Sequence, residues 1–192
     1  MSYQPKILAF AGSSRLASFN KKLVKFTAEI VKEIGAEVNY IDLLDYPMPI
    51  FNEDLEQKTG LPAKVKEFKL LLQQHQGFLI SCPEYNGSIT PLLKNAIDWA
   101  SRSELNEQPL SCFQGKVAGL LATSPGSLGG IRGLAHVRAI LAGIGVIVIP
   151  KQKAIPSAHQ AFDASGRLKD EKQIDGIRAL AQQLVEVTSK LA

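Results

Sequence analysis

The sequence predicts an α/β fold, in which a five-stranded parallel sheet is covered by helices on both faces. Five short apolar runs bounded by Gly or Pro have the length and composition of buried strands. Between them lie longer segments whose apolar residues recur every three or four positions, as in amphipathic helices. Strands that alternate with helices form parallel sheets through right-handed crossovers, so three layers are expected.

The first predicted strand, Lys6–Ala11, is a near-continuous apolar run that ends at Gly12. Such a run is typical of a strand buried on both faces of a parallel sheet. The second strand, predicted at 37–44, alternates more regularly between polar and apolar residues. The other three strands are predicted at 77–82, 116–123 and 145–150.

The first helix is predicted to begin at Ser18 and to end before Gly35, a residue that commonly stops helices. A Pro-rich loop at 46–51 precedes a second helix, predicted at 61–75. In the third helix, predicted at 90–102, Thr90 is expected to be the N-cap and Pro91 the first helical residue. Two further helices are marked by apolar stripes, one from Leu134 to Leu141 and one from Ile174 to Leu191, with no clear pattern in the loop before Gly166.

Five strands in this succession suit the flavodoxin-like order 2-1-3-4-5, a three-layer sandwich whose switch point lies between strands one and three. Ligands of open α/β sheets bind at the carboxyl ends of the strands at such a switch point. The loops after strands one and three are therefore expected to lie side by side and to form the binding site.

The 192 residues are expected to form a single domain, 1–192. The start of the chain lacks a signal-peptide pattern and no apolar run approaches a membrane span, which predicts a soluble, cytoplasmic protein without a membrane partner. The net charge of +4 is modest and its basic residues are scattered, so no nucleic-acid partner is expected. The two Cys and three His residues have no metal-ligand spacing, and Cys82 is expected to lie in the core.

The loop after the first strand, 12–20, runs directly into a helix and combines three Ser hydroxyls, the Asn20 amide and the Arg15 guanidinium. Free backbone N–H groups and the positive end of the helix dipole make this position an anion site. The loop lacks the Gly patterns of dinucleotide and nucleoside triphosphate sites. Its composition favours one terminal phosphate, although Ser18 can also serve as the N-cap and Arg15 as a solvated charge.

The loop after the third strand, 83–88, has a make-up that suits a flat polar ring. Gly87 allows close backbone approach, Asn86 offers both a donor and an acceptor, and Pro83 and Tyr85 offer apolar faces. Asn-Gly is also a common turn pair, so from these residues alone a plain tight turn is an equal alternative.

A phosphate loop beside a ring-binding loop, at the switch point of a five-stranded sheet, describes a site for flavin mononucleotide (FMN). The sequence also resembles the NADPH-dependent FMN reductase family, which includes chromate, quinone and azo reductases. The resemblance rests on four segments: Gly-Ser-x-Arg-x-x-Ser-x-Asn at 12–20, Pro-Glu-Tyr-Asn-Gly at 83–87, Leu-Lys-Asn-Ala-Ile-Asp-Trp at 93–99, and Gly129-Gly130.

This resemblance implies the cofactor-binding residues. The phosphate would be held by Ser13, Arg15, Ser18 and Asn20, with Phe19 in the same motif. The ribityl chain and ring would be lined by Pro83, Glu84, Tyr85, Asn86 and Gly87, with Ser124 and Gly126 approaching from a third loop. Lys94, Asn95, Asp98 and Trp99 are interpreted as packing and subunit contacts.

The leading interpretation is an FMN-dependent enzyme that takes hydride from NADPH or NADH and reduces a flavin, quinone, azo or metal-oxyanion acceptor in a ping-pong scheme. A homodimer or homotetramer is expected, with the helix at 90–102 near the interface. One alternative is a flavodoxin-like electron carrier, which the Arg15 side chain and the net positive charge of this chain disfavour. Another is a phosphate-ligand binding module without redox activity. An acyl-transfer enzyme is weaker, because Ser127 lacks the Gly-x-Ser-x-Gly elbow. No catalytic side chain is assigned.

Overall fold

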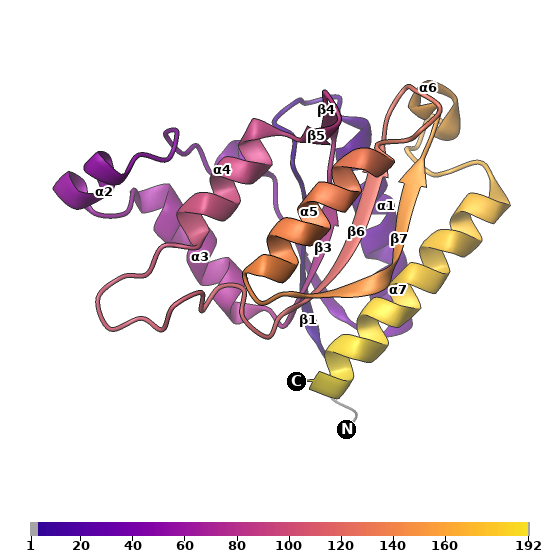
Figure 1. Ribbon diagram of the computed structural model, residues 1–192. Helices are drawn as coiled ribbons and strands as arrows, with labels where there is room; N and C mark the ends of the chain where they lie inside the picture. Colours follow the sequence, from indigo (N-terminus) through magenta and orange to yellow (C-terminus); the bar gives the residue numbers. More distant parts are fainter. Residues whose placement is uncertain (1–3, 192) are drawn as a thin grey trace.

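A parallel five-stranded sheet forms the centre of the computed structural model, which describes residues 4–191 (Figure 1). Its strands are β1 (Lys6–Ala11), β2 (Glu37–Tyr40), β3 (Gly77–Ser81), β6 (Val117–Thr123) and β7 (Ile147–Ile155). Their spatial order is β2-β1-β3-β6-β7, which confirms the predicted flavodoxin-like order. The start of the chain, where no signal peptide is expected, lies partly outside the described residues.

Helices cover both faces of this sheet, as the predicted three-layer sandwich requires (Figure 1). Helices α1 (Phe19–Ile34) and α7 (Glu171–Leu191) pack together on one face. The opposite face is covered by α3 (Ala63–Gln74), α4 (Pro91–Ala100) and α5 (Ile131–Gly143). Among the described helices, none is both long and apolar enough to cross a membrane.

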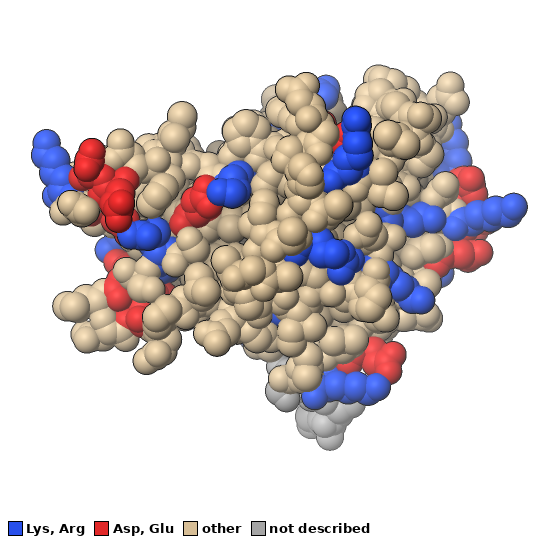
Figure 2. Space-filling model, viewed as in Figure 1, with Lys and Arg blue, Asp and Glu red and all other residues tan. Residues whose placement is uncertain are grey.

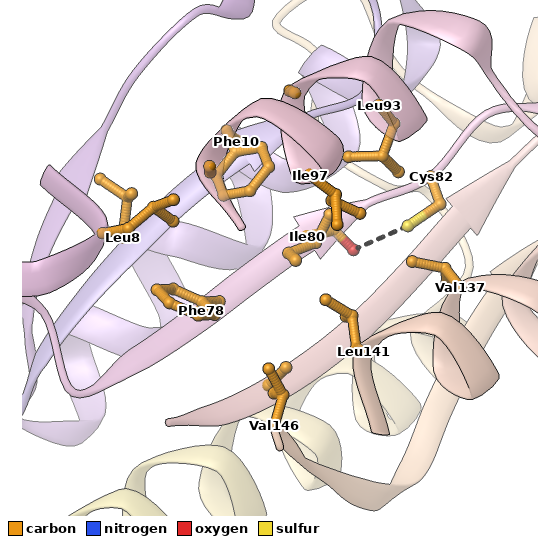
Figure 3. Close-up of a cluster of buried hydrophobic side chains, with 14 of the residues drawn as sticks. Leu8, Phe10, Phe78, Ile80, Cys82, Leu93, Ile97, Val137, Leu141 and Val146 are labelled. Carbon is orange, nitrogen blue, oxygen red and sulfur yellow. Dashed lines mark hydrogen bonds between the residues drawn. The ribbon is translucent and has the colours of Figure 1, made fainter. Parts of the chain in front are cut away.

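The core under α4 and α5 is built from side chains that alternate along the strands (Figure 3). Phe78 and Ile80 of β3 belong to this cluster together with Ile97 of α4 and Leu141 of α5, and all four are buried. Cys82 completes this cluster as expected, with its Sγ 3.8 Å from the carbonyl oxygen of Ile80. Burial raises the pKa of this thiol, so it remains a neutral core group.

The second strand is shorter than predicted, because it ends at Tyr40 rather than at residue 44. Asp42 redirects the chain there: its Oδ1 accepts a hydrogen bond from the Leu44 N–H at 3.0 Å and begins the short 3₁₀ helix η1 (Leu43–Asp45). A side chain that caps its own backbone competes with strand pairing, and β2 is an edge strand with only one neighbour.

The fifth strand is longer than predicted, because β7 continues to Ile155 after a bulge opposite Ala118 and Leu120. Pro150 lies in this bulge, where its missing N–H removes no hydrogen bond of the ladder. Arg138 of α5 bonds to carbonyl groups of the bulge. Its guanidinium donates to the carbonyl oxygen of Val148 at 3.2 Å and to that of Ile149 at 2.9 Å.

Two short helices and a short two-stranded hairpin were not predicted. Helix α2 (Glu53–Thr59) follows the Pro-rich loop, and α6 (Ala158–Ala161) lies in the segment without a clear pattern. Strands β4 (Glu84–Tyr85) and β5 (Ser88–Ile89) form a hairpin within the expected ring-binding loop.

Asn95 and Trp99 of α4 face the Pro-rich loop of the same chain. Trp99 is fully buried, donates from Nε1 to the Pro49 carbonyl at 2.7 Å and packs edge-on against Phe51. Asn95 holds the same loop, with its Oδ1 2.7 Å from the Phe51 nitrogen. Asn95 and Trp99 are therefore packing contacts, as interpreted, and the contacts of Trp99 lie within its own chain.

Candidate functional site

Three loops meet at the carboxyl edge of the sheet, because the strands that precede them end in register. Ala11 of β1 is paired with Ser81 of β3, and Ser81 is paired with Leu121 of β6. Residues 12–18, the hairpin 84–89 and residues 124–130 leave the sheet from these ends, at the upper edge in Figure 1. The predicted juxtaposition of the first two loops is thus present, and the third loop lies on the other side of the hairpin.

The loop 12–18 ends at the amino terminus of α1. Ser18 is the N-cap, as expected, and its Oγ accepts from the Lys21 N–H at 3.4 Å. Ser13 is buried and its Oγ accepts from the Arg15 N–H at 3.3 Å. The Arg15 side chain is exposed, and no carboxylate among the described residues lies within ion-pairing distance of it. The loop therefore presents a free guanidinium beside the N–H groups of the first helical turn, which have no acceptor within the helix.

Asn20 has a different position from the one that its motif suggested. Its side chain is buried, where Oδ1 accepts from Ser81 Oγ at 2.8 Å and from the Thr123 N–H at 3.1 Å. Its Nδ2 donates to the Thr123 carbonyl at 2.9 Å. Asn20 thereby fastens the start of α1 to the ends of β3 and β6, so its contribution to an anion site is to position the loop.

Phe19 packs against the segment that follows β7. Its ring lies edge-on to His159, 5.0 Å between centroids, and is stacked with Phe162 at 6.2 Å. Nothing in the motif indicates this packing, because both partners come from the segment that has no pattern in the sequence.

Thr90 joins the loop 12–18 to α4. Its Oγ1 accepts from the Leu93 N–H as the predicted N-cap, and it also donates to the Gly12 carbonyl at 2.7 Å. Gly12 is required at this junction, because a Cβ there would lie 2.9 Å from the Leu93 Cβ. The second role of Thr90 is invisible in the sequence, since its partner is 78 residues away.

A partly buried ion pair also supports this loop and was not predicted. Lys21 is only 5% exposed, and its Nζ lies 2.5 Å from Asp42 Oδ2. Asp42 belongs to the turn after β2, so the pair ties the first turn of α1 to the neighbouring strand. No local pattern marks the two residues as partners.

The hairpin 84–89 is compatible with both interpretations of its sequence, a tight turn and a loop that binds a flat ring. Asn86 and Gly87 both have positive φ, 51° and 83°, as a tight hairpin turn with two left-handed residues requires. The turn projects from the carboxyl end of β3, with Pro83 buried at its base and Tyr85 51% exposed. The residues therefore form a tight turn and, at the same time, present an aromatic face and an amide at the edge where ligands bind.

Glu84 caps helix α5. Its Oε2 accepts from the backbone N–H groups of Arg132 at 3.0 Å and Gly133 at 3.2 Å, and its Oε1 accepts from Arg132 Nε at 2.7 Å. Burial alone would raise the pKa of Glu84, but the hydrogen bond from Gly133 and the bonds and charge of Arg132 outweigh burial and lower the pKa. The carboxylate is ionised and held within its own chain, so it is no proton donor at neutral pH.

The third loop, 124–130, is fastened to the segment after β7. The Ser124 N–H donates to the Ile155 carbonyl at 3.3 Å, and the Gly126 carbonyl accepts from the Ser157 N–H at 3.3 Å. Gly129 permits this packing, because a Cβ there would lie 2.7 Å from the Ile155 carbonyl carbon. Ser124 is half-buried and Gly126 is exposed at the same edge as the other two loops.

Taken together, the edge offers a hydroxyl, N–H and guanidinium cluster beside an exposed aromatic turn. This donor set fits a phosphate monoester joined to a flat ring, and thus fits FMN. Among residues 4–191, no group of three or more His, Cys, Asp or Glu side chains lies close enough to hold a metal ion.

Comparison with known proteins agrees with this fit. Residues 5–160 match the family model described as NADPH-dependent FMN reductase. The chain is 35% identical to an NAD(P)H:quinone oxidoreductase of Solanum tuberosum, over 100% of this chain and 97% of the relative. It is 37% identical to an NAD(P)H-dependent FMN reductase of Pseudomonas aeruginosa, over 96% and 95% of the two chains.

A solved structure extends the likeness to three dimensions. The flavoenzyme NAD(P)H:(acceptor) oxidoreductase of Paracoccus denitrificans superposes with a TM-score of 0.83 at 27% identity, covering 97% of this chain and 98% of that one.

Proposed function

Because the chain belongs to the NADPH-dependent FMN reductase family, we propose that it is an FMN-dependent NAD(P)H oxidoreductase. Its acceptors are quinones, flavins, azo compounds or metal oxyanions such as chromate. Quinones are the acceptors that we expect first, since relatives from Solanum tuberosum and from Escherichia coli are named as a quinone oxidoreductase and a quinone reductase.

The observation that carries this proposal is the anion site at the start of α1. Ser13 and Ser18 lie beside the N–H groups of the first helical turn, and the Arg15 side chain is free to close over a phosphate. Asn20, Lys21 and Thr90 hold this loop in place through bonds to three neighbouring elements. The loop is thus organised before a ligand arrives, which reduces the entropy lost on binding.

The ring of the cofactor would lie against the hairpin turn and the third loop. Tyr85 and Asn86 are exposed on the hairpin, while Ser124 and Gly126 lie at the neighbouring strand end. Pro83 and Gly87 shape the turn, and Glu84 orients it by bonding to α5. Most of the contacts to the ring would then come from backbone groups and from aromatic or amide faces.

Bound FMN supplies the redox chemistry, as it accepts hydride from a nicotinamide nucleotide and passes electrons to the acceptor. The chain needs only to bind, orient and leave one face accessible. Glu84 is paired with Arg132, and residues 83–88 include neither His nor Lys, so no side chain of the turn itself is placed as a general acid or base. His136 of α5 contacts the turn from outside, with its Nδ1 2.9 Å from Ser88 Oγ. Donor and acceptor would occupy the same place in turn, which gives ping-pong kinetics.

Titration with FMN and with riboflavin tests the cofactor assignment. FMN should bind at about one per chain, and riboflavin, which lacks the phosphate, far more weakly, because the phosphate loop anchors the ligand. Equal affinities by fluorescence titration would refute the assignment.

Initial rates with the FMN-loaded protein test the activity and the kinetic scheme. Oxidation of NADPH or NADH with a quinone should give parallel double-reciprocal lines. Absence of turnover with FMN bound would indicate an electron carrier, and intersecting lines would indicate two separate substrate sites.

Three further properties belong to the same proposal. The chain acts as one FMN-binding domain over 1–192 and associates as a homodimer or homotetramer. It works in the cytoplasm, where its nicotinamide donor is found. Its partners are small molecules rather than nucleic acid or membrane.

A further inference from the structure

A cleft of about 740 Å³ lies between α1, α7 and the loop 163–167. It is on the face of the sheet that α1 and α7 cover, and the hairpin 84–89 does not line it. Its volume is within the range of small-molecule sites in proteins. Because the cleft is not formed by the hairpin or by residues 124–130, the cofactor assigned to those loops does not account for it.

The walls of the cleft combine an apolar floor with polar edges. Phe26, Ile30 and Ile174 contribute the apolar surface, from α1 on one side and α7 on the other. Tyr40 of β2 also lines it, and its hydroxyl is buried without a hydrogen-bond partner among the described residues. A buried hydroxyl without a partner is uncommon in folded proteins. Burial, together with Asp42 and Asp45, raises the pKa of Tyr40 to about 12, so this hydroxyl remains a donor.

The charges of the cleft are unequally distributed along it. Lys22, Lys25 and Arg167 line the end nearest the start of α1, and no described carboxylate lies within ion-pairing distance of them. Lys25 instead lies over the Tyr40 ring, 4.7 Å from its centroid. Among the described lining residues, the one carboxylate without an ion pair is that of Glu171, at the start of α7.

The acidic groups of the other end are already compensated. Glu33 is 3.7 Å from Arg178, and Glu29 is 2.9 Å from Lys32. The cleft therefore has a positive end with uncompensated cations, an apolar middle and an approximately neutral far end. Such an arrangement is complementary to a molecule that has an anionic head and an apolar body.

We propose that this cleft is a second binding site, distinct from the cofactor site, for a small organic anion. The ligand has a carboxylate, sulfonate or phosphate group attached to an aromatic or branched apolar body. Its anionic group lies between Lys25 and Arg167, and its apolar part covers Phe26 and Ile174.

Calorimetric titration of the FMN-loaded protein with 1-naphthyl phosphate tests the proposal. The compound should bind. 1-Naphthol, which lacks the anionic group, and inorganic phosphate, which lacks the apolar body, should each bind at least tenfold more weakly. Lys25→Gln and Arg167→Gln should each weaken binding about fivefold, and FMN content and quinone reduction should be unchanged. Lys172→Gln, an equal charge change on α7 outside the cleft, serves as the control.

Backbone amide shifts in the nuclear magnetic resonance spectrum distinguish this site from the flavin face. Shifts on titration should concentrate in residues 22–33 and 163–178. No detectable binding at 1 mM, equal binding by the two variants, equal affinity for 1-naphthol, or shifts confined to the hairpin 84–89 would each overturn the proposal. Because FMN content is measured independently, these failures would leave the proposed oxidoreductase function intact.

Discussion

Arg15 is the residue at which the anion site can be tested most directly, because its side chain is exposed and makes no ion pair among the described residues. Arg15→Ala removes a charge-assisted hydrogen bond worth about 1.5–3 kcal/mol. FMN affinity should therefore fall roughly 10- to 100-fold. Fluorescence titration measures the change, with Arg178→Ala on α7 as the matched control. Unchanged affinity would show that the phosphate lies elsewhere.

Glu84 is the residue whose role changes most between sequence and structure. The motif suggests a cofactor contact, whereas the carboxylate caps α5 and pairs with Arg132. Glu84→Gln should lower the free energy of unfolding by about 1–2 kcal/mol while flavin reduction by NAD(P)H continues. Urea unfolding and stopped-flow reduction measure the two effects. Loss of nearly all flavin reduction, with FMN still bound, would reveal an acid function that the geometry does not indicate.

The lowered pKa of Glu84 also has a consequence for acid stability. A carboxyl group with a lowered pKa in the folded state stabilises the protein above its unfolded pKa, and this contribution is lost as the pH falls through the folded pKa. The stability of the wild-type protein should therefore decline more steeply below about pH 4.3 than that of Glu84→Gln.

At the scale of elements, the long connection between α4 and β6 is held by one buried ionic cluster. Lys69 of α3 is almost fully buried, and its Nζ lies 2.6 Å from Glu107 and contacts the Arg102 carbonyl. Burial would raise the pKa of Glu107, but Lys69, Ser111 and the Glu104 N–H outweigh it and lower the pKa to about 2. The contribution of this pair is thus present above about pH 4.5 and is lost between about 4.5 and 2.

Removing that carboxylate should have a measurable and pH-dependent effect. Glu107→Gln should lower the free energy of unfolding by about 2–3 kcal/mol at pH 7, because Lys69 remains buried without its partner. Between pH 4.5 and 2 the difference from wild type should shrink. Denaturant unfolding at several pH values measures it, and Glu104→Gln, on a more exposed carboxylate paired with Lys66, is the control. A difference that is independent of pH would contradict the assignment.

At the scale of the whole molecule, association is the main expectation that one chain does not reveal. Charged side chains gather at the α2 end and toward α7, and the surface between them, which carries the Lys94–Asp98 pair of α4, is mostly uncharged (Figure 2). Ile50, in the loop that α4 binds, is 87% exposed. We predict that this surface, with Ile50 at its centre, forms the subunit contact, whereas Trp99 packs within its own chain.

Light scattering at micromolar concentration should give at least a dimer. Ile50→Glu should shift the population toward smaller species, because a charge would be buried at the contact. Leu191→Glu, at an exposed position at the end of α7, should leave the assembly unchanged. A wild-type monomer would contradict the expectation, and an unaffected Ile50→Glu oligomer would place the contact on another surface.

The sequence by itself determined the features that depend on local periodicity and on residues that begin or end a helix or strand, such as Gly, Pro, Ser and Thr. Apolar runs ending at Gly12 and Pro83 marked buried strands, and Ser18 and Thr90 marked helix starts, since both signals act over a few residues. The strand order followed because right-handed crossovers leave few arrangements of five such strands. The position of the loop 12–18 between a strand end and a helix start was predictable for the same reason, and its role as an anion site stays a prediction.

Only the tertiary structure decided which of the motif residues face outward. Asn20 and Glu84 turn into the protein because their partners, Ser81, Thr123 and Arg132, come from strands and helices distant in sequence. The bulge of β7 likewise depends on Arg138, a side chain of the preceding helix. Hydrogen-bond satisfaction of buried polar groups is a property of the folded arrangement, so no local pattern can reveal it.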